Sequence, residues 1–336
     1  MRKMATVRKI DDIRPIEGAD AIECAVIGGW TVVIKKGEFK VGDLAVYCEI
    51  DSWIPHDLAP FLSKASEPRE YNGVKGERLR TVKLRGQLSQ GLLLSRYVAL
   101  DKIGEILVGQ DVSEILGIQK YEAPVPAQLA GEVHGVFPGF IPKTDQERIQ
   151  NLTAELEEWK TEKLSWEVTE KMDGSSMTVY VMGDEYGVCS RNLNLKENAN
   201  NSLWRVQNQN NLLEKIRSTG RNLAFQGEIV GEGIQKNRYK IRGQDFYMFD
   251  IYDIDNGKYL NPVERRNLAE TLGIKHVPVL KSDEVLEVCN VSHILLWAEG
   301  VATMGGMERE GVVFKCNERE VSFKAISNKF LLKGGE

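Results

Sequence analysis

Short apolar runs separated by glycine turns fill the first third of the chain. Residues 25–27, 31–34 and 44–48 are rich in β-branched and aliphatic side chains, and Gly28-Gly29 lies between the first two runs. Residues 80–85 alternate polar and apolar side chains, as a half-buried strand does. This pattern predicts a small β-barrel of about five or six strands, and the OB fold is the leading candidate.

The pattern changes near the middle of the chain. Four prolines fall between residues 121 and 143, and we interpret this stretch as the connection between two domains. A helix is expected directly after it, because Thr144 and Glu147 have the spacing of a capping box. Apolar residues then follow at helical intervals, namely Ile149, Leu152, Leu156 and Trp159.

Hairpins and helices alternate beyond residue 165. The expected elements are a hairpin over 177–190 that turns at Gly183-Asp184-Glu185, a strand over 245–253 before an Asn256-Gly257 turn, and a helix over 262–272 with Asn261 as its N-cap. The expected fold class is therefore α+β. An OB-like β-barrel domain with its connection should cover residues 1–125, and a domain of antiparallel sheets and helices should cover residues 126–336.

Composition excludes several classes of protein. Of the 336 residues, 42% are hydrophobic and 28% are charged, as in a globular protein. The sequence holds no apolar run long enough for a membrane span and no signal peptide, and its five cysteines and four histidines are scattered. A membrane protein, a disulfide framework and a histidine or cysteine metal site are thus disfavoured, and a cytoplasmic protein is expected.

One tetrapeptide carries candidate chemistry. Lys171-Met172-Asp173-Gly174 follows a strand-like run and precedes the predicted hairpin. A lysine acts as a nucleophile only when its pKa is lowered by desolvation or by nearby positive charge. Asp173 is placed to hold a metal-bound water, and Gly174 permits a close backbone approach to a ligand. Alone, such a K-x-D-G sequence is a weak signal.

Five further motifs follow in a fixed order. They are Ser190-Arg191-Asn192, Phe225-Gln226-Gly227-Glu228, Phe246-Tyr247-Met248-Phe249-Asp250-Ile251, Glu310-Gly311-Val312-Val313-Phe314-Lys315 and Val321-Ser322-Phe323-Lys324. With the lysine tetrapeptide, this series resembles the covalent nucleotidyltransferase superfamily of polynucleotide ligases and RNA capping enzymes. Within it, the chain is most similar to ATP-dependent RNA ligases that carry an N-terminal OB domain.

The resemblance implies a role for each motif. Lys171 would attack the α-phosphate of ATP and form lysyl-AMP, with Lys324 and Arg191 as cationic catalytic residues. The nucleotide would be bound by Glu170, Lys171, Arg191, Glu228, Phe249, Glu310 and Lys324. Mg²⁺ or Mn²⁺ would be held by Asp173, Glu228 and Glu310, through water, because Mg²⁺ sheds its water reluctantly.

The implied reaction is the joining of a 5′-phosphate RNA end to a 3′-hydroxyl RNA end by a monomeric enzyme. Two alternatives are a capping-type guanylyltransferase that uses GTP and a non-catalytic RNA-binding module. The sequence stops 12 residues after Lys324, which disfavours the capping enzyme because such enzymes append a further OB domain there. The intact Lys171, Glu228 and Glu310 weigh against the non-catalytic module. Many RNA ligases have a second lysine where this chain has Ile326, which leaves the partner of the β- and γ-phosphates open, with Lys329 and Lys333 as candidates.

Two more detailed expectations concern RNA and the last hairpin. The net charge is −5, yet residues 69–85 hold six basic and two acidic residues. This stretch is a candidate for RNA backbone contacts, through Arg69, Lys75, Arg78, Arg80, Lys83 and Arg85, with Tyr71 among them.

If Cys316, Asn317 and Glu318 form a three-residue loop, with a bulged or left-handed residue near Asn317, Glu310 falls opposite Lys324; a four-residue loop pairs Glu310 with Ala325.

Overall fold

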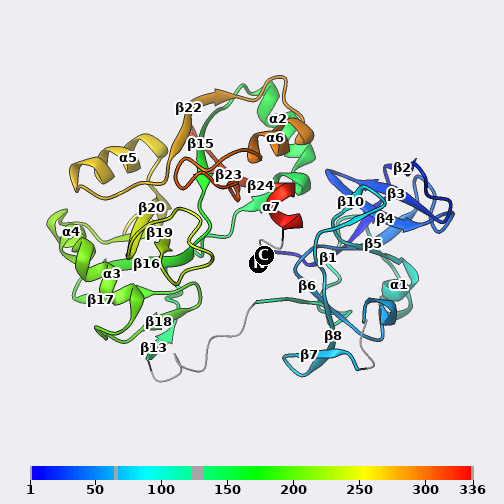
Figure 1. Cartoon of the computed structure of the whole chain (residues 1–336), viewed down its shortest axis with the longest axis horizontal. Helices are drawn as coiled ribbons and strands as arrows, with labels where there is room; N and C mark the ends of the chain where they lie inside the picture. The colour runs from blue at the N-terminus through cyan, green and yellow to red at the C-terminus, as the bar shows by residue number, and fades with distance from the viewer. Residues whose placement is uncertain (1, 64–66, 123–131, 334–336) are drawn as a thin grey trace. The chain divides into compact units, whose positions relative to one another are not determined.

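The computed structural model in Figure 1 describes residues 2–63, 67–122 and 132–333. The chain divides into two compact units. Unit 1 consists of Met1–Pro124 and Gln150–Thr153, and unit 2 consists of Val125–Ile149 and Ala154–Glu336. We keep the limits 1–125 and 126–336 as our proposal for the two functional domains. In the part of the chain that the structure describes, no helix is long and apolar enough to cross a membrane.

Unit 1 is built almost entirely of antiparallel strands. One sheet has the order β1 (Ala5–Lys9), β5 (Leu44–Cys48) and β11 (Leu92–Ser95), and another has β2 (Asp12–Pro15), β3 (Ile22–Ile27) and β4 (Trp30–Lys35). A four-stranded sheet has the order β12 (Gln119–Lys120), β6 (Ser52–Pro55), β8 (Val74–Arg78) and β7 (Arg69–Tyr71). The hairpin β9 (Val82–Leu84) and β10 (Gln87–Ser89), the 3-10 helix η1 (Pro60–Leu62) and the helix α1 (Tyr97–Ile103) complete the unit.

The strand periodicity predicted for unit 1 matches its core. In β4, Trp30, Val32 and Ile34 are buried, and the residues between them are half-buried. Residues 45–48 of β5 are all buried, because this strand lies between β1 and β11. The three runs expected as strands over 25–27, 31–34 and 44–48 are thus confirmed as parts of β3, β4 and β5.

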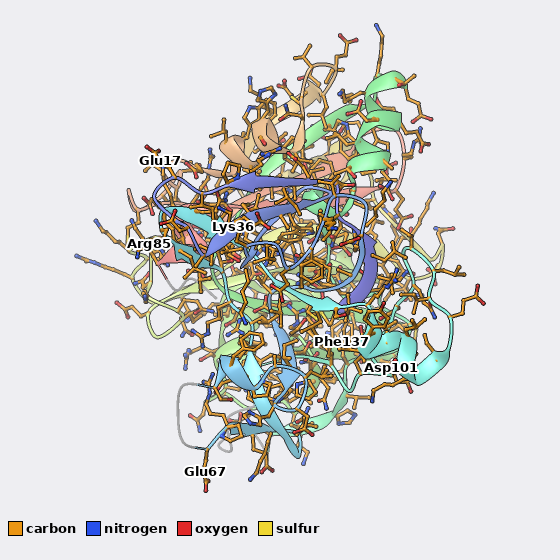
Figure 2. The ribbon with its side chains drawn as sticks, turned by 90° about the vertical axis from the view of Figure 1, so that its right-hand side faces the viewer. Glu17, Lys36, Glu67, Arg85, Asp101 and Phe137 are labelled. Carbon is orange, nitrogen blue, oxygen red and sulfur yellow. The ribbon has the colours of Figure 1, made fainter. Side chains whose placement is uncertain are left out.

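The basic stretch 69–85 is divided between two sheets. Arg69, Lys75 and Arg78 lie on β7 and β8 of the four-stranded sheet, whereas Lys83 lies on the separate β9–β10 hairpin. Arg85 sits in the turn of that hairpin with a φ of +48° and is exposed at the surface (Figure 2). The strand expected over 80–85 is shorter, because regular pairing covers only 82–84.

Unit 2 contains two larger sheets. The seven-stranded sheet has the order β13 (Val133–Val136), β18 (Leu193–Leu195), β17 (Glu185–Cys189), β16 (Ser175–Met182), β19 (Leu223–Gly231), β20 (Gln244–Asp253) and β21 (Lys258–Tyr259). The five-stranded sheet has the order β14 (Glu147–Arg148), β24 (Ser322–Ile326), β23 (Gly311–Cys316), β15 (Ser165–Lys171) and β22 (Val279–Val285). All pairs are antiparallel except β14 with β24.

Helices cover both sheets of unit 2. They are α2 (Thr153–Thr161), α3 (Ser202–Asn210), α4 (Leu212–Ser218), α5 (Pro262–Thr271), α6 (Val291–Ala298) and α7 (Asn328–Leu332), with the 3-10 helix η3 (Ile149–Asn151) before α2. Residues of α3, α4 and α5 share a buried cluster with β16, β19 and β20. Against the five-stranded sheet, Trp159 of α2 stacks on Phe323 with ring centroids 5.4 Å apart.

Local signals predicted several elements of unit 2 correctly. Helix α5 begins after Asn261, which forms a capping box with Glu264, and Gly273 follows its end with a φ of +59°. The hairpin of β16 and β17 turns at Gly183, and β20 pairs with β21 beyond the Asn256-Gly257 turn.

The helix expected at Thr144 is wrong. Glu147 and Arg148 form strand β14, which pairs with Phe323 and Lys324 of β24, and the helix begins only at Thr153. The backbone of Glu147 is paired with β24, so it cannot adopt the helical conformation that a capping box requires. The connection expected over 121–143 is also too long: residues 123–131 lie outside the described part, but β13 already pairs with β18 inside unit 2.

Candidate active site

Most of the predicted site residues line one cavity of unit 2. Its volume is about 90 Å³. Its lining comes from both sheets and includes Lys171, Glu170, Arg191, Glu228, Phe249 and Lys324. Glu310 joins the group through a contact with Lys171, and Asp173 follows Lys171 by two residues. A larger cavity of about 670 Å³ shares Asp145 and Lys315 with the first but contains none of the predicted residues.

Strand pairing places Lys171 and Lys324 on the same face of the five-stranded sheet. Lys171 is the last residue of β15 and lies opposite Gly311 of β23, and Thr169 lies opposite Val313. Val313 in turn lies opposite Lys324 of β24. Since side chains two residues apart share a face, Lys171, Val313 and Lys324 all point into the cavity.

The predicted register of the last hairpin is wrong. Gly311 pairs with Ile326 and Val313 with Lys324, so Glu310 is opposite neither Lys324 nor Ala325. The backbone carbonyl of Glu310 instead accepts a hydrogen bond from the Ser327 N–H at 2.8 Å. The loop spans residues 317–321, and none of its residues has a positive φ.

Glu310 contacts the nucleophile candidate directly. The Nζ of Lys171 donates to Oε1 of Glu310 at 2.6 Å, and both side chains are largely buried. Glu310 reaches this position because it lies one residue before β23 begins, outside the strict alternation of the strand. The pair puts a proton acceptor beside the amine, which suits proton transfer from Lys171.

Two cationic groups of the cavity converge on one carboxylate. Asp145 accepts from Arg191 at 3.0 Å and contacts the Nζ of Lys324 at 3.5 Å. Asp145 precedes β14 and lines the same cavity. An anionic substrate that binds here would meet two positive side chains already gathered at one point.

Asp173 is held by residues of the loop between β19 and β20. Its Oδ2 accepts from Nε of Arg238 at 2.5 Å, and its backbone N–H donates to the hydroxyl of Tyr239 at 2.6 Å. Gly174 packs closely on β19, because a Cβ there would lie 2.5 Å from the carbonyl oxygen of Ile229. Its close approach to a ligand stays a prediction.

Glu228 carries a buried carboxylate oxygen. Among the described residues, its Oε2 has no hydrogen-bond partner. Burial raises the pKa of Glu228 to about 8, with a further increase from the charges of Glu310 and Asp173 and an opposing effect of Lys171. A carboxylate that is enclosed, unpaired and close to two other acids suits a site for a cation.

The acidic residues fit a hydrated metal ion better than a bare one. Across residues 2–63, 67–122 and 132–333, no three Asp, Glu, His or Cys side chains come close enough to hold a metal directly. The orphaned oxygen of Glu228 nevertheless offers an acceptor to a metal-bound water. Asp173 and Glu310 are the other acidic side chains whose charges reach Glu228.

Phe249 forms one wall of the cavity and Lys315 lies beside it. The Nζ of Lys315 is 5.5 Å from the centre of the Phe249 ring and donates to the Phe249 carbonyl at 2.5 Å. The same ammonium pairs with Asp250 at 2.5 Å. Burial lowers the pKa of Lys315 to about 8, although the carboxylate of Asp250 opposes that effect.

The side chain of Glu170 is occupied by a different partner. It is 1% exposed, and its Oε2 accepts from the backbone N–H of Thr303 at 2.8 Å and from the Thr303 hydroxyl at 2.7 Å. Glu170 adjoins Lys171 in β15, so its side chain alternates to the other face of the sheet. Nucleotide binding by Glu170 stays a prediction.

Sequence reasoning missed the partners of the motif residues. These are Asp145, Arg238, Tyr239 and Thr303. Asp145 lies in the stretch whose capping-box spacing predicts a helix start. Arg238 and Tyr239 lie in a loop whose Gly231, Gly233 and Gly243 all have positive φ, and these glycines were the signal for an ordered loop.

Comparisons with known proteins identify the families that both parts of the chain resemble. A family model described as RNA ligase matches residues 164–327, and an OB-fold domain model matches residues 4–96. No curated protein matches the chain.

Several solved structures of an RNA ligase from Naegleria gruberi are similar over almost the whole chain at 50% identity. An apo form of an alanine variant has a TM-score of 0.92 and covers 99% of this chain and 98% of its own. The form with pyrophosphate has a TM-score of 0.91, and the match covers 100% of this chain and 99% of the ligase chain. A lysine-to-alanine variant with ATP and Mn has a TM-score of 0.90, and the match covers 98% of this chain and 99% of the ligase chain.

The OB fold expected for the first part of the chain and the α+β class are confirmed by these matches. The identity and the coverage leave one conclusion about ancestry: the chain belongs to the RNA ligase family.

Proposed function

We propose that this protein joins RNA ends through a lysyl-AMP intermediate, with Lys171 as the nucleophile. The observation that carries the proposal is the Lys171–Glu310 contact of 2.6 Å beside a cavity that Lys171, Lys324 and Arg191 line. The N. gruberi ligase, which is 50% identical, has been solved with ATP and Mn and with pyrophosphate. ATP is thus the expected nucleotide here.

In the first step, Nζ of Lys171 attacks the α-phosphorus of ATP. A nitrogen–phosphorus bond forms, the bond to pyrophosphate breaks, and the amine proton passes to the carboxylate of Glu310. Lys324 and Arg191 exchange Asp145 for the phosphates and stabilise the charge that develops there. Phe249 offers its ring to the adenine base.

Two transfers complete the reaction. An oxygen of the RNA 5′-phosphate attacks the phosphorus of lysyl-AMP, and the amine of Lys171 leaves. The 3′-hydroxyl of the other RNA end then attacks the 5′-phosphorus, a phosphodiester forms, and AMP departs. Asp173, Glu228 and Glu310 would hold the waters of Mg²⁺ or Mn²⁺, which supplies charge neutralisation to the phosphates when bound.

Labelled nucleotides test this function against both alternatives. The protein is incubated with ATP or GTP labelled in the α-phosphate and analysed on a denaturing gel. We expect label from ATP alone, together with sealing of an RNA nick that carries a 5′-phosphate and not of one that carries a 5′-hydroxyl. Label from GTP alone would indicate a capping enzyme, and no label from either nucleotide would indicate a non-catalytic module.

We also propose a monomeric enzyme of the cytoplasm. All five cysteines are free and buried, which suits a reducing compartment. Light scattering of the full chain and localisation of a tagged copy in the source cell test the two parts separately.

A further inference from the structure

Three aromatic rings from different strands meet in unit 1, far along the chain from the nucleotide motifs. Trp53 lies on β6, Tyr71 ends β7, and Tyr121 follows β12. The ring centroids of Trp53 and Tyr71 are 5.4 Å apart, those of Trp53 and Tyr121 are 5.9 Å apart, and those of Tyr71 and Tyr121 are 4.9 Å apart. We call these three residues the aromatic cluster.

Backbone contacts fix two of the rings. Nε1 of Trp53 donates to the carbonyl of Val74 at 3.0 Å, and the Tyr71 hydroxyl accepts from the Glu122 N–H at 3.0 Å. Trp53 is 2% exposed and forms the floor of the cluster, whereas Tyr71 and Tyr121 are half-buried. Since the polar atoms of Trp53 and Tyr71 are bonded to backbone, these rings present flat apolar surface.

The aromatic cluster lines a cavity of about 160 Å³ together with charged residues. The charged residues are Arg69, Glu70, Arg78 and Arg80. Arg78 places its guanidinium 4.8 Å from the centre of the Tyr121 ring and also pairs with Asp51. Arg69 pairs with Glu77, while Arg80 is exposed and forms no ion pair with any residue that the structure describes.

We propose that this cavity binds a base of single-stranded RNA by stacking on Tyr71 and Tyr121, with Arg80 and Arg69 contacting the adjacent phosphates. Proteins that bind single-stranded nucleic acids combine aromatic faces for the bases with cations along the backbone, and OB folds use this combination repeatedly. The proposal rests on the proposed RNA ligase function and extends it to a site in unit 1 for the RNA strand.

The chemistry of the cavity favours a nucleotide over a purely apolar occupant. Three of its four charged residues are arginines, which attract phosphate, and Arg80 is the one of these that forms no ion pair with any described residue. Stacking on a ring is tolerant of base identity because every base has a flat face, so this cavity would hold the strand without demanding one sequence. Arg78 lies over one face of the Tyr121 ring, so a base that stacks on that face takes the place of the guanidinium.

The test measures binding of the full-length protein to a single-stranded RNA that contains 2-aminopurine. Stacking quenches the fluorescence of this base, so the signal reports on the proposed contact. We expect quenching with the wild-type protein, and binding roughly tenfold to a hundredfold weaker for Tyr71→Ala or Tyr121→Ala. Tyr121→Phe keeps the ring and should bind as the wild type does. Tyr97→Ala, an exposed tyrosine of α1, is the matched control and should also bind normally.

Salt dependence separates stacking from charge. The tyrosine variants lose no charge, so the slope of log K against log salt concentration should stay unchanged. Arg80→Ala removes one phosphate contact, so the magnitude of this slope should fall by about one. Normal RNA binding by a folded Tyr121→Ala variant would overturn the proposal. Lysyl-AMP formation needs no RNA: its absence in the wild type would refute the ligase function, a failure distinct from loss of the RNA site.

Crosslinking tests whether RNA contacts Tyr71 and Tyr121 without the use of variants. RNA that carries 4-thiouridine is irradiated on the wild-type protein, and the crosslinked peptides are identified by mass spectrometry. Crosslinks at Tyr71 or Tyr121 support the proposal even if the alanine variants fail to fold. Crosslinks confined to other peptides would contradict it.

Discussion

The Nζ of Lys171 lies 2.6 Å from Oε1 of Glu310, so the amine that we propose as the nucleophile of this RNA ligase is paired with a carboxylate. Lys171 is opposite Gly311 in the sheet, and Glu310 bends toward it from just outside β23. The contact stabilises the charged amine, which is unreactive, and also supplies the group that can remove its proton. We therefore propose that Glu310 accepts the amine proton, in addition to binding the metal waters that its motif implies.

Replacement of this acceptor should slow the first step. Glu310→Gln keeps the shape of the side chain but is a far weaker base, and we expect lysyl-AMP formation to fall by about 10²- to 10⁴-fold. The remaining activity should rise with pH, because hydroxide replaces the lost base. Single-turnover labelling with ATP across a pH series measures both effects. Glu308→Gln removes a surface carboxylate that pairs with Lys333 and should leave the rate unchanged. A normal rate in Glu310→Gln would refute the proposed proton transfer.

Asp145 should compete with ATP for two cations. It contacts both Arg191 and Lys324, and the nucleotide phosphates must take its place. We therefore expect Asp145→Asn to bind ATP roughly fivefold more tightly, equivalent to one partly exposed ion pair of about 1 kcal/mol. Calorimetric titration with ATP checks this, with the exposed Asp184→Asn as control. Weaker ATP binding by Asp145→Asn would mean that Asp145 orients the cations instead of competing for them.

The buried carboxylate of Glu228 should make stability depend on pH. Because burial raises its pKa to about 8, the folded protein holds this proton to higher pH than the unfolded chain, whose value is 4.5. The stabilising effect of that proton is complete below 4.5 and disappears as the pH rises through about 8.

Glu228→Gln should therefore be more stable than the wild type at pH 9 by roughly 1–3 kcal/mol, and the difference should vanish at pH 5. Urea unfolding of the metal-free protein at the two pH values measures it. The exposed Glu232→Gln should unfold as the wild type does at both pH values. An equal stability difference at pH 5 and pH 9 would show that Glu228 is ionised throughout.

A buried network of charges supports the wall formed by Phe249 and Lys315. Arg265 and Glu167 are both fully buried and form an ion pair, and Arg265 also lies 3.6 Å from Asp250, the partner of Lys315. Nε of Arg265 donates to Nε2 of His276 at 3.0 Å. Burial and the charge of Arg265 lower the pKa of His276 to about 3, so the imidazole is neutral and able to accept.

Loss of one member of this network should be costly. We expect Arg265→Ala to lower the free energy of unfolding by about 3–5 kcal/mol, because the buried Glu167 loses one of its two arginine partners and Asp250 also loses a nearby cation. Arg319→Ala breaks an exposed pair with Glu162 and should cost no more than about 1 kcal/mol. Urea unfolding of both variants gives the comparison, and equal costs would show that the buried network contributes nothing special.

The elements that the sequence predicted well are those whose signals are local. Helix α5 has an N-cap, a proline in its first turn and a glycine after its end within a dozen residues, and each feature acts on neighbouring backbone. The motif residues Lys171, Arg191, Glu228, Phe249 and Lys324 were likewise identified from short runs, and the structure brings them to one cavity.

The errors arose where distant segments decide the outcome. Thr144 and Glu147 have the spacing of a capping box, but β24 pairs with residues 147–148 and draws them into a sheet. The loop of the last hairpin is held from outside, because the Asn317 side chain donates to Ser165 and Ser282. Neither the β24 pairing nor the Asn317 hydrogen bonds can be predicted from the neighbouring sequence. The pairing register of β23 with β24 depends on the length of this loop, so an error in the loop became an error in the register.

We expect the ε-amino group of Lys171 to become bonded to AMP, and peptide mass spectrometry detects this bond. The protein is incubated with ATP and Mn²⁺, digested and analysed, with Lys171→Arg as control. We expect one adenylyl group on the peptide that contains Lys171 and none on the same peptide of the control. An adduct on another residue, or no adduct under conditions in which the protein seals RNA, would contradict it.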